Sequence, residues 1–530
     1  MLAALTSDLS PHPAFFVLLV GLISYYLAQY FQSPWRRLPP GPKGLPLLGN
    51  ALQLGDKLWL TFGVFRKTFG DIVYLNAAGQ PIIVISSKKI ATDLLDRRAS
   101  NYSDRPPSFV ASELLSGGLA LGLSRYNDTW RKLRKAGMEG FNKGAVHNYH
   151  GTQSAEALRL AAGILAQPDK WDAHFRRSVA SAVMSIVYDS PIASETDPSV
   201  RQINDQAARV TRAASPGANF VQFFPWMRHI PRRRVLSCRT ILAKWKRDAQ
   251  DWHERDSLVF EGLLNSVAKR LAKGETYPSY AATLIEDTGR HNLSEREKAW
   301  LAGTMFAAGA DTTSGVMAWW LLAMISYPET QKRAQAELDA VVGRSRVPTF
   351  ADFEHLPYVR SMVKESLRWR SAFPIGAPHR CMEDDWYEGH FIPAGTTVIA
   401  NVWEMNRDPE VYGVDAAEFN PARFLDAQGN MAPGITDTKE ESHLSFGFGR
   451  RICMGRHVAS NSLFIFYAML LWSMNIEPET DENGRPVLLG VERVVQEGLV
   501  VRPEPFKCTF TPRFPEVRAI VEQEMELMGR

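Results

Sequence analysis

One helical segment between residues 294 and 327 constrains the fold of this chain more than any other feature of its sequence. Ser294 is followed three residues later by Glu297, which is the pattern of a capping box at the start of a helix. Pro328 ends the segment, because a proline ring clashes with the preceding helical turn. At about 1.5 Å per residue the segment spans roughly 50 Å. The sequence therefore predicts a large domain crossed by one long helix.

The middle of this segment is a poor helix former. Residues 308–313 read AGADTT, and a glycine inside a helix costs about 1 kcal/mol relative to alanine. The two threonines add to that cost, because β-branched side chains lose rotamer freedom in a helix. A sequence that accepts such a cost usually gains something locally. Taken alone, these residues also fit a kinked core helix with a solvated aspartate.

A glycine-rich loop around Cys453 carries the strongest chemical signal. Residues 446–455 read FGFGRRICMG and precede a long apolar run. The glycines let the backbone approach a flat macrocycle where a side chain would clash, and amide N–H groups near the sulfur can hold it as a thiolate. These features indicate a haem-thiolate site, in which Arg451 pairs with a haem propionate and the thiolate favours O–O cleavage. A buried free cysteine beside a turn is the structural alternative.

Two further motifs place functional side chains on helix faces. Glu365 and Arg368 are adjacent on a helix, and Arg423, in the run FNPARF, can close a network with them. An ordinary surface ion pair is the alternative for the first two residues. Trp130 and Arg134 lie one helical turn apart, so both can face one edge of a ligand. An amphipathic surface helix explains that spacing equally well.

Composition favours one catalytic domain. The 530 residues contain no low-complexity tract or repeat that would separate domains, and the net charge of +4 is too small to indicate nucleic-acid binding. The four cysteines form no CxxC pair, which argues against a zinc site and a disulfide framework. The pattern is mostly helical over residues 88–342, with short strands expected at 71–75, 81–85, 391–400, 498–502 and 508–512. The predicted fold class is α-rich α+β, with small antiparallel sheets near both ends.

The N-terminal segment differs from the rest of the chain. Residues 13–31 carry no charge, and Arg36 and Arg37 follow them. A helix of this length spans about 29 Å, enough to cross the hydrocarbon core, and the basic residues place the remaining chain in the cytosol. We therefore expect a membrane anchor at 1–33, a proline-rich hinge at 34–50 and a haem-binding catalytic domain at 51–530. A cleaved signal peptide is the alternative, although it normally needs a basic segment ahead of the apolar stretch.

Together, these motifs resemble those of the cytochrome P450 family over nearly the whole chain after residue 38. The cysteine loop matches the signature Phe-x-x-Gly-x-Arg-x-Cys-x-Gly, and the other motifs occur in family order. The resemblance implies a cytochrome P450 fold that binds haem b (iron protoporphyrin IX) through the Cys453 thiolate. It also implies haem contacts for Trp130, Arg134, His379, Arg451, Phe446 and Gly455, oxygen activation by Asp311 and Thr312, and a structural triad of Glu365, Arg368 and Arg423.

The activity that the resemblance implies is that of a haem-thiolate monooxygenase, which inserts one atom of O2 into a lipophilic small molecule. The chain carries no flavin or nicotinamide fingerprint, so a separate NADPH-dependent cytochrome P450 reductase is expected to supply electrons. The chain resembles microsomal proteins of fungal specialised metabolism, which implies a single-pass protein of the endoplasmic reticulum membrane with a cytosolic catalytic domain. Two alternatives stay open. One is a haem-thiolate isomerase or dehydratase, although such relatives tend to lose the Asp-Thr pair, and the other is a non-catalytic haem-binding protein.

Loops are expected to form most of the substrate pocket. The candidate lining residues are Phe109, Ala308, Phe373, Ile375 and Leu499. Apolar side chains of this kind suit a hydrophobic substrate, although each residue type also occurs in ordinary cores. The sequence therefore predicts an apolar pocket without specifying the substrate, because fold-level resemblance carries no information on it.

Overall fold

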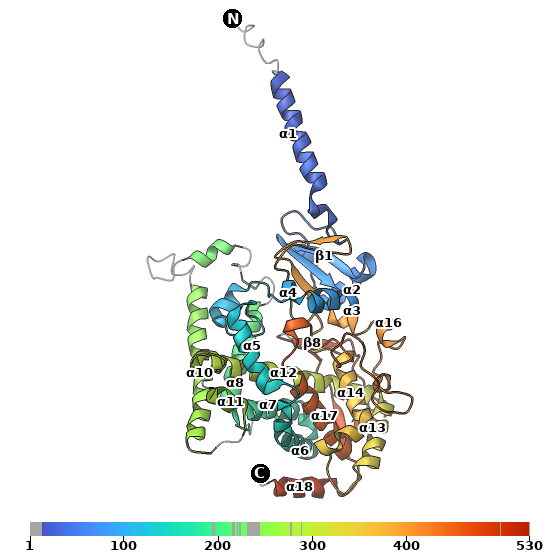
Figure 1. Ribbon diagram of the computed structural model, residues 1–530. Helices are drawn as coiled ribbons and strands as arrows, with labels where there is room; N and C mark the ends of the chain where they lie inside the picture. Colours follow the sequence, from blue (N-terminus) through green and yellow to red (C-terminus); the bar gives the residue numbers. More distant parts are fainter. Residues whose placement is uncertain are drawn as a thin grey trace.

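The structure is a computed structural model that describes residues 13–192, 197–214, 218–219, 221, 224–230, 244–275, 278–287, 289–498 and 500–528. Figure 1 shows a helical body with a smaller sheet region near α1. The α-helices are α1 (Pro13–Gln32), α2 (Leu58–Phe69), α3 (Lys88–Ala91), α4 (Ala99–Tyr102), α5 (Asp128–Phe141), α6 (His150–Ala166), α7 (Trp171–Tyr188), α8 (Pro198–Ala214), α10 (Lys244–Ala272), α11 (Tyr280–Glu286), α12 (Glu295–Ser326), α13 (Pro328–Val341), α14 (Pro357–Trp369), α15 (Val402–Met405), α16 (Pro409–Tyr412), α17 (Arg456–Ser473) and α18 (Val517–Leu527).

Shorter helical turns connect these elements. Two of them have the wider π-helical geometry, namely η3 (Thr92–Arg97) and η4 (Phe109–Leu115). The 3-10 turns are η1 (Pro34–Arg37), η2 (Ala51–Gln53), η5 (Ala145–Tyr149), η6 (Pro168–Lys170), η8 (Pro225–His229), η9 (Phe350–His355), η10 (Pro421–Phe424) and η11 (Gly449–Arg451).

Helix α12 confirms the long central segment predicted from the sequence. Its 32 residues begin with both hydrogen bonds of the capping box, from Glu297 N to Ser294 Oγ (3.2 Å) and from Ser294 N to Glu297 Oε2 (2.8 Å). It ends at Ser326, and its C-cap residue Tyr327 stands directly before Pro328. Figure 1 shows α12 inside the body, with α7, α10 and α17 around it.

Close packing along α12 depends on small residues. A Cβ on Gly303 would lie 2.5 Å from the Phe260 ring of α10, so glycine allows that helix to approach. On the α17 side, the rings of Trp320 and Tyr467 are stacked with centroids 4.2 Å apart. Both rings are fully buried, so α12 and α17 share one core. This packing fixes α17, which begins three residues after Cys453.

The largest sheet has the strand order β1-β2-β6-β3, built from β1 (Ile72–Ala77), β2 (Gln80–Ile85), β6 (Thr397–Ala400) and β3 (His379–Arg380). The predicted N-terminal hairpin is confirmed, because β1 and β2 are antiparallel neighbours. The prediction of purely antiparallel sheets is wrong, since β2 and β6 are parallel, with Ile83 opposite Val398. Such a pairing joins segments about three hundred residues apart, which local sequence patterns do not report.

Three two-stranded antiparallel sheets complete the fold. They pair β4 (Asp385–Tyr387) with β5 (His390–Ile392), β7 (Met474–Pro478) with β10 (Cys508–Pro512), and β8 (Val494–Glu497) with β9 (Val500–Pro503). The strands expected at 498–502 and 508–512 both form, as β9 and β10. Strand β9 pairs with β8, and strand β10 pairs with β7. The hairpin of β8 and β9 lies against α12, where Trp319 Nε1 donates to Val501 O at 2.9 Å.

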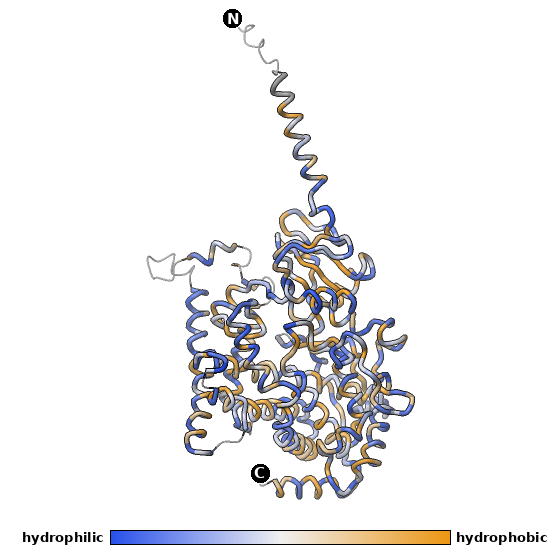
Figure 2. The backbone as a smooth tube through the Cα atoms, in the orientation of Figure 1, coloured by the Kyte–Doolittle hydropathy of each residue, from blue (hydrophilic) through white to orange (hydrophobic). Residues whose placement is uncertain are grey.

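The N-terminal segment forms helix α1, which projects from the body in Figure 1. Polar and apolar positions both occur along it (Figure 2), and in its second half Gln29 Nε2 donates to the exposed Tyr25 hydroxyl at 3.0 Å. Within the described ranges, no helix combines the length and the apolar character that a membrane span requires. The prediction of a single-pass membrane helix in residues 1–33, and of the endoplasmic reticulum membrane as the location derived from it, is therefore wrong. The domain boundaries at residues 33 and 50 stay predictions.

Candidate active site

The loop of residues 446–455 turns sharply before it reaches Cys453. Gly447 and Gly449 have φ angles of 76° and 55°, which L-residues with a side chain rarely adopt. A Cβ on Gly449 would lie 2.1 Å from the carbonyl oxygen of Leu95 in η3, so only glycine fits. The turn then closes with Cys453 N donating to Phe446 O at 2.8 Å. The glycines of the motif are therefore needed to fold the loop itself.

The Cys453 thiol is accessible and stands among hydrogen-bond donors and cations. Cys453 is exposed, whereas Arg451 and Met454 are buried. Although Cys453 is exposed, the protein packed around it reduces the hydration of the thiolate and raises the pKa of the thiol. A hydrogen bond from Gly455 N and the guanidinium groups of Arg134 and Arg456 act in the opposite direction. These donors favour the thiolate, which is the form that ligates a metal.

A group of buried cations lies beside this loop. Arg451 donates to the carbonyl oxygens of Ser103 (2.7 Å), Leu121 (3.2 Å) and Ser124 (2.8 Å). Desolvation, together with the charge of neighbouring arginines, lowers the pKa of Arg451 to about 8. Arg134 donates to Ile452 O at 2.6 Å, and desolvation lowers its pKa to about 10.

Arg105 belongs to the same group, although no sequence motif singles it out. Its guanidinium donates to the carbonyl oxygens of Gly122, Ala377 and Pro378 at 2.7–3.0 Å. Burial lowers its pKa to about 10, and the charge of Arg134 acts in the same direction. Its position in the run DRPP matches none of the spacings considered, so only the folded structure reveals it.

His379 and Trp130 complete the surroundings of the cations. His379 is buried, and its Nδ1 lies 2.8 Å from Tyr102 O. Burial lowers the pKa of His379 to about 3, helped by the charges of Arg105 and Arg451. The guanidinium of Arg451 stacks over the Trp130 ring at 4.2 Å, so the structure brings Trp130, Arg134, His379 and Arg451 together.

The middle of α12 contains one exposed position among buried and half-buried neighbours. Ala308 is exposed, while Phe306 and Ala310 are buried. Thr312 Oγ1 donates to Ala308 O at 2.7 Å, so the hydroxyl is engaged with its own helix. Burial raises the pKa of the Asp311 carboxyl, against the opposing charges of Arg176 and Arg502.

Glu365, Arg368 and Arg423 form a compact buried network. Arg368 donates from Nε to Glu365 Oε2 and from Nη2 to Oε1, both at 2.7 Å, and Arg423 Nε donates to Oε1 at 3.1 Å. Both side chains of the first pair are 0% exposed. Arg368 also reaches the carbonyl oxygens of Asn406 and Ala416 at 2.6 Å each, and thereby joins α14 to the segment before the cysteine loop.

The predicted pocket residues are scattered over several elements. Phe109, in η4, packs edge-on against Trp245 of α10 with ring centroids 6.2 Å apart. Phe373 and Ile375 are half-buried in the turn after α14 and contact the main core. Leu499 lies outside the described residues. Of the five, Ala308 is the one at the exposed position in the middle of α12.

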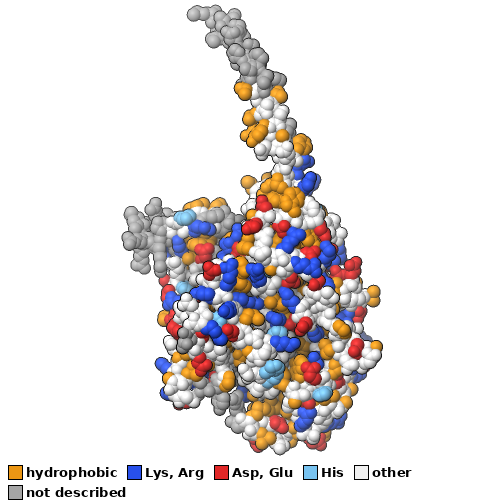
Figure 3. All heavy atoms as spheres, in the orientation of Figure 1, with side chains coloured by type: hydrophobic (Ala, Val, Ile, Leu, Met, Phe, Trp, Pro, Cys, Tyr) orange, Lys and Arg blue, Asp and Glu red, His pale blue; other side chains and the backbone are white. Residues whose placement is uncertain are grey.

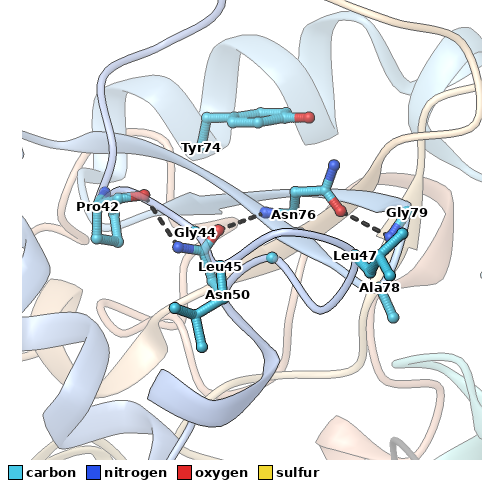
Figure 4. A pocket seen from close by; sticks show the side chains of 10 residues that line it. Pro42, Gly44, Leu45, Leu47, Asn50, Tyr74, Asn76, Ala78 and Gly79 are labelled. Carbon is cyan, nitrogen blue, oxygen red and sulfur yellow. Dashed lines mark hydrogen bonds between the residues drawn. The ribbon is translucent and has the colours of Figure 1, made fainter.

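A surface hollow of about 630 Å³ is lined by other residues (Figure 4). It lies between the proline-rich segment and the turn of β1 and β2. Its polar groups bond one another, since Asn50 Nδ2 donates to Pro42 O (2.9 Å), Asn76 N to Asn50 Oδ1 (2.8 Å) and Gly79 N to Asn76 Oδ1 (2.7 Å). None of its lining residues belongs to the group around Cys453, so the hollow plays no part in the candidate site.

The chemistry of the residues around Cys453 fits a haem. Arg105, Arg134 and Arg451 place positive charge in a buried region, and the neighbouring carboxylate, Asp104, is already bonded to Arg125 and Arg380 at 2.9–3.1 Å. The two propionates of a haem would supply the matching negative charge. An accessible sulfur with an N–H donor supplies the axial ligand. The fold and this site define a haem-thiolate oxidoreductase.

Comparison with known proteins gives the family. The cytochrome P450 family model matches residues 39–510. A cytochrome P450 monooxygenase of Armillaria gallica is 61% identical over 517 residues, which cover 98% of both chains. One from Postia placenta is 47% identical over 91% of this chain and 90% of its own, and the iboC monooxygenase of Amanita muscaria is 40% identical over 96% and 97%. The chain belongs to the cytochrome P450 family, and it is an oxidoreductase of the monooxygenase type.

Proposed function

We propose that this monooxygenase oxidises a lipophilic small molecule of fungal specialised metabolism and takes its electrons from a separate NADPH-dependent flavoprotein reductase. The observation that carries the proposal is the exposed Cys453 thiol, which accepts a hydrogen bond from Gly455 N beside buried arginines. Bound through a thiolate, haem iron supplies the activation and cleavage of O2. The side chains of this protein are proposed to hold the haem in place and to deliver protons.

The residues around Cys453 are proposed to hold the haem. One largely buried region contains the guanidinium groups of Arg105, Arg134 and Arg451, and the Trp130 ring stacks on Arg451. Since guanidinium groups pair strongly with carboxylates, these side chains would hold the propionates. His379 would donate from Nε2 only as imidazolium, because its Nδ1 already faces the Tyr102 carbonyl. The negative charge of a propionate would have to oppose the burial and the arginine charges that lower the pKa of His379. Phe446 and Gly455 would fix the backbone on either side of the sulfur.

Asp311 and Thr312 are proposed to deliver protons in the middle of α12. The raised pKa of Asp311 keeps a proton available at a higher pH than for a free aspartate. The Thr312 hydroxyl donates to Ala308 O and keeps lone pairs that can accept, so it can pass a proton by rotating its O–H. The pair supports a monooxygenase over an isomerase or dehydratase, because neither of those reactions consumes O2 or needs protons for its reduction.

Exposed basic side chains near the cysteine loop support an acidic protein partner. Arg131 and Lys135 on α5 and Arg450 in the loop are exposed. Figure 3 shows lysine and arginine side chains gathered over the face where α5 lies. A surface of this charge would attract the acidic surface of a reductase.

The proposal is tested by incubating the haem-loaded protein with a reductase, NADPH and isotopically heavy O2, across terpenoids, indoles, polyketides and sterols. The expected result is a product that carries one heavy oxygen atom and forms only when NADPH is present. A product that forms without NADPH and O2 would instead identify an isomerase or dehydratase. Ligand binding without any turnover of any compound would identify a haem-binding protein.

A further inference from the structure

Asp96 lies behind the cysteine loop and contacts it directly. Its carboxylate oxygen Oδ1 accepts a hydrogen bond from Gly449 N at 2.5 Å. The same oxygen contacts the ammonium group of Lys439. The Asp96 side chain is 17% exposed, so the contact is shielded from water on most sides. Hydrogen bonds to a charged acceptor are stronger than neutral ones, most of all where water is excluded.

The backbone around Asp96 is unusual. Asp96 belongs to η3, a π-helical turn. This geometry occurs mostly as single turns, and such turns are frequent at functional sites. The neighbouring Leu95 carbonyl occupies the place where a Cβ on Gly449 would be, at 2.1 Å. Leu94, Leu95 and Phe448 are buried in one apolar cluster, so η3 and the loop form a single packed contact.

Lys439 reaches Asp96 from a strained segment. Asp437, Lys439, Glu440 and Ser442 all have positive φ angles, between 53° and 71°, although none of them is glycine. Conformations of this kind persist only where the surroundings fix them. Lys364 helps to fix the conformation of this segment, since its Nζ donates to Glu440 O at 2.7 Å. The segment therefore holds Lys439 against Asp96 in a defined position.

A chain of bonds leads from Asp96 to the thiol. Gly449, whose N–H is held by Asp96, accepts from Ile452 N at 3.3 Å, and Ile452 O accepts from Arg134 at 2.6 Å. The peptide of Ile452, directly before Cys453, is thus fixed at both ends. Displacing Gly449 would release the turn of η11 and with it the direction of the sulfur.

We propose that Asp96 is a positioning residue that clamps the cysteine loop through Gly449 N and holds the Cys453 thiolate in its ligating orientation. Lys439, which contacts the same carboxylate oxygen, holds the Asp96 side chain oriented toward the loop. The inference rests on Cys453 as the haem ligand, but it does not depend on the substrate or on turnover.

The test follows the red-shifted absorption band of the reduced, carbon monoxide-bound holoenzyme, which reports thiolate ligation. Its loss over time in dilute urea is compared between the wild type, Asp96→Ala and Asp93→Ala. Asp93 is the matched control, because it lies on the same turn but bonds Arg97 and Tyr387 instead of the loop. We expect Asp96→Ala to speed the loss by about tenfold to a hundredfold, the factor for one lost charge-assisted hydrogen bond, and Asp93→Ala to change it little.

Equal rates for the two variants, or a rate of loss in Asp96→Ala equal to that of the wild type, would overturn the proposal. If Asp96→Ala does not load haem, Asp96→Asn decides, with Asp93→Asn as its control, because asparagine keeps the Oδ1 acceptor but loses the charge. Asp96→Asn is expected to lose the band faster than the wild type and faster than Asp93→Asn; a rate equal to that of Asp93→Asn would contradict the clamp. A wild type without any red-shifted band would refute the haem-thiolate assignment itself, which keeps the two failures distinct.

Discussion

Replacing Glu365 with glutamine tests the buried network of α14 most sharply. Glutamine has nearly the same shape as glutamate, but it removes the negative charge between Arg368 and Arg423. The Oε1 position keeps its bonds from Arg423 Nε (3.1 Å), Arg368 Nη2 (2.7 Å) and Asn420 N (2.7 Å). The amide nitrogen would then face Arg368 Nε, which lies 2.7 Å from Glu365 Oε2, so two donors would meet.

The size of the effect follows from the burial of the pair. Arg368 and Glu365 are both fully buried, and loss of one partner from a buried ion pair typically costs about 3–5 kcal/mol. Arg368 keeps its bonds to the carbonyl oxygens of Asn406 and Ala416, which places the expected loss near the lower limit, about 3 kcal/mol. A native domain is stable by only about 5–15 kcal/mol, so the variant should be severely weakened.

Urea unfolding of the haem-loaded protein, followed by tryptophan fluorescence, measures this loss. Glu354→Gln is the matched control, because Glu354 pairs with Arg360 near the same helix at 2.6 Å but is 74% exposed. An exposed pair contributes less than about 1 kcal/mol. If Glu365→Gln lowered the urea midpoint no more than Glu354→Gln does, the network would not stabilise the fold as argued.

Four further predictions concern the haem region and α12. Thr312→Ala should leave haem bound, since alanine suits a helix, but should divert NADPH oxidation from product to peroxide; an undiminished product yield would contradict the proton role. Because burial raises the pKa of Asp311, product formed per NADPH should fall as pH rises through that pKa, and Asp311→Asn should flatten this dependence. Arg502→Gln should move the fall to higher pH, because the Arg502 charge lowers the pKa of Asp311; a shift to lower pH would reverse the assignment. Arg105→Gln should weaken haem retention in a transfer assay by about tenfold or more, and unchanged retention would exclude Arg105 from propionate binding.

Local sequence signals predicted the elements whose causes are local. The capping box at Ser294 and the proline after Tyr327 act within one turn of the chain, and α12 begins and ends where they indicate. The turn at Cys453 is similar, because Gly447 and Gly449 are required by their own φ angles. The motif around Cys453 therefore predicted the shape of the loop as well as the chemistry proposed for it.

Features that depend on distant parts of the chain escaped prediction. The parallel pairing of β2 with β6 joins segments about three hundred residues apart, which no local pattern reports. Arg105 is held by backbone carbonyls such as that of Ala377, and Asp96 is held by Gly449 N. These partners lie more than two hundred residues away in the sequence, and neither Arg105 nor Asp96 lies in a recognisable motif. The N-terminal prediction, made from an uncharged and largely apolar stretch of sufficient length, is wrong, because no helix within the described residues is long and apolar enough to cross a membrane.

The central claim is that Cys453 ligates the haem iron through its thiolate. The most direct test is the spectrum of the reduced protein with carbon monoxide, for the wild type and for Cys453→Ala. The account predicts the red-shifted band of a thiolate-ligated haem in the wild type and its complete loss in the variant, even where the variant still binds haem. A variant that kept the red-shifted band, or a haem-loaded wild type that lacked it, would contradict the assignment of Cys453 as the ligand.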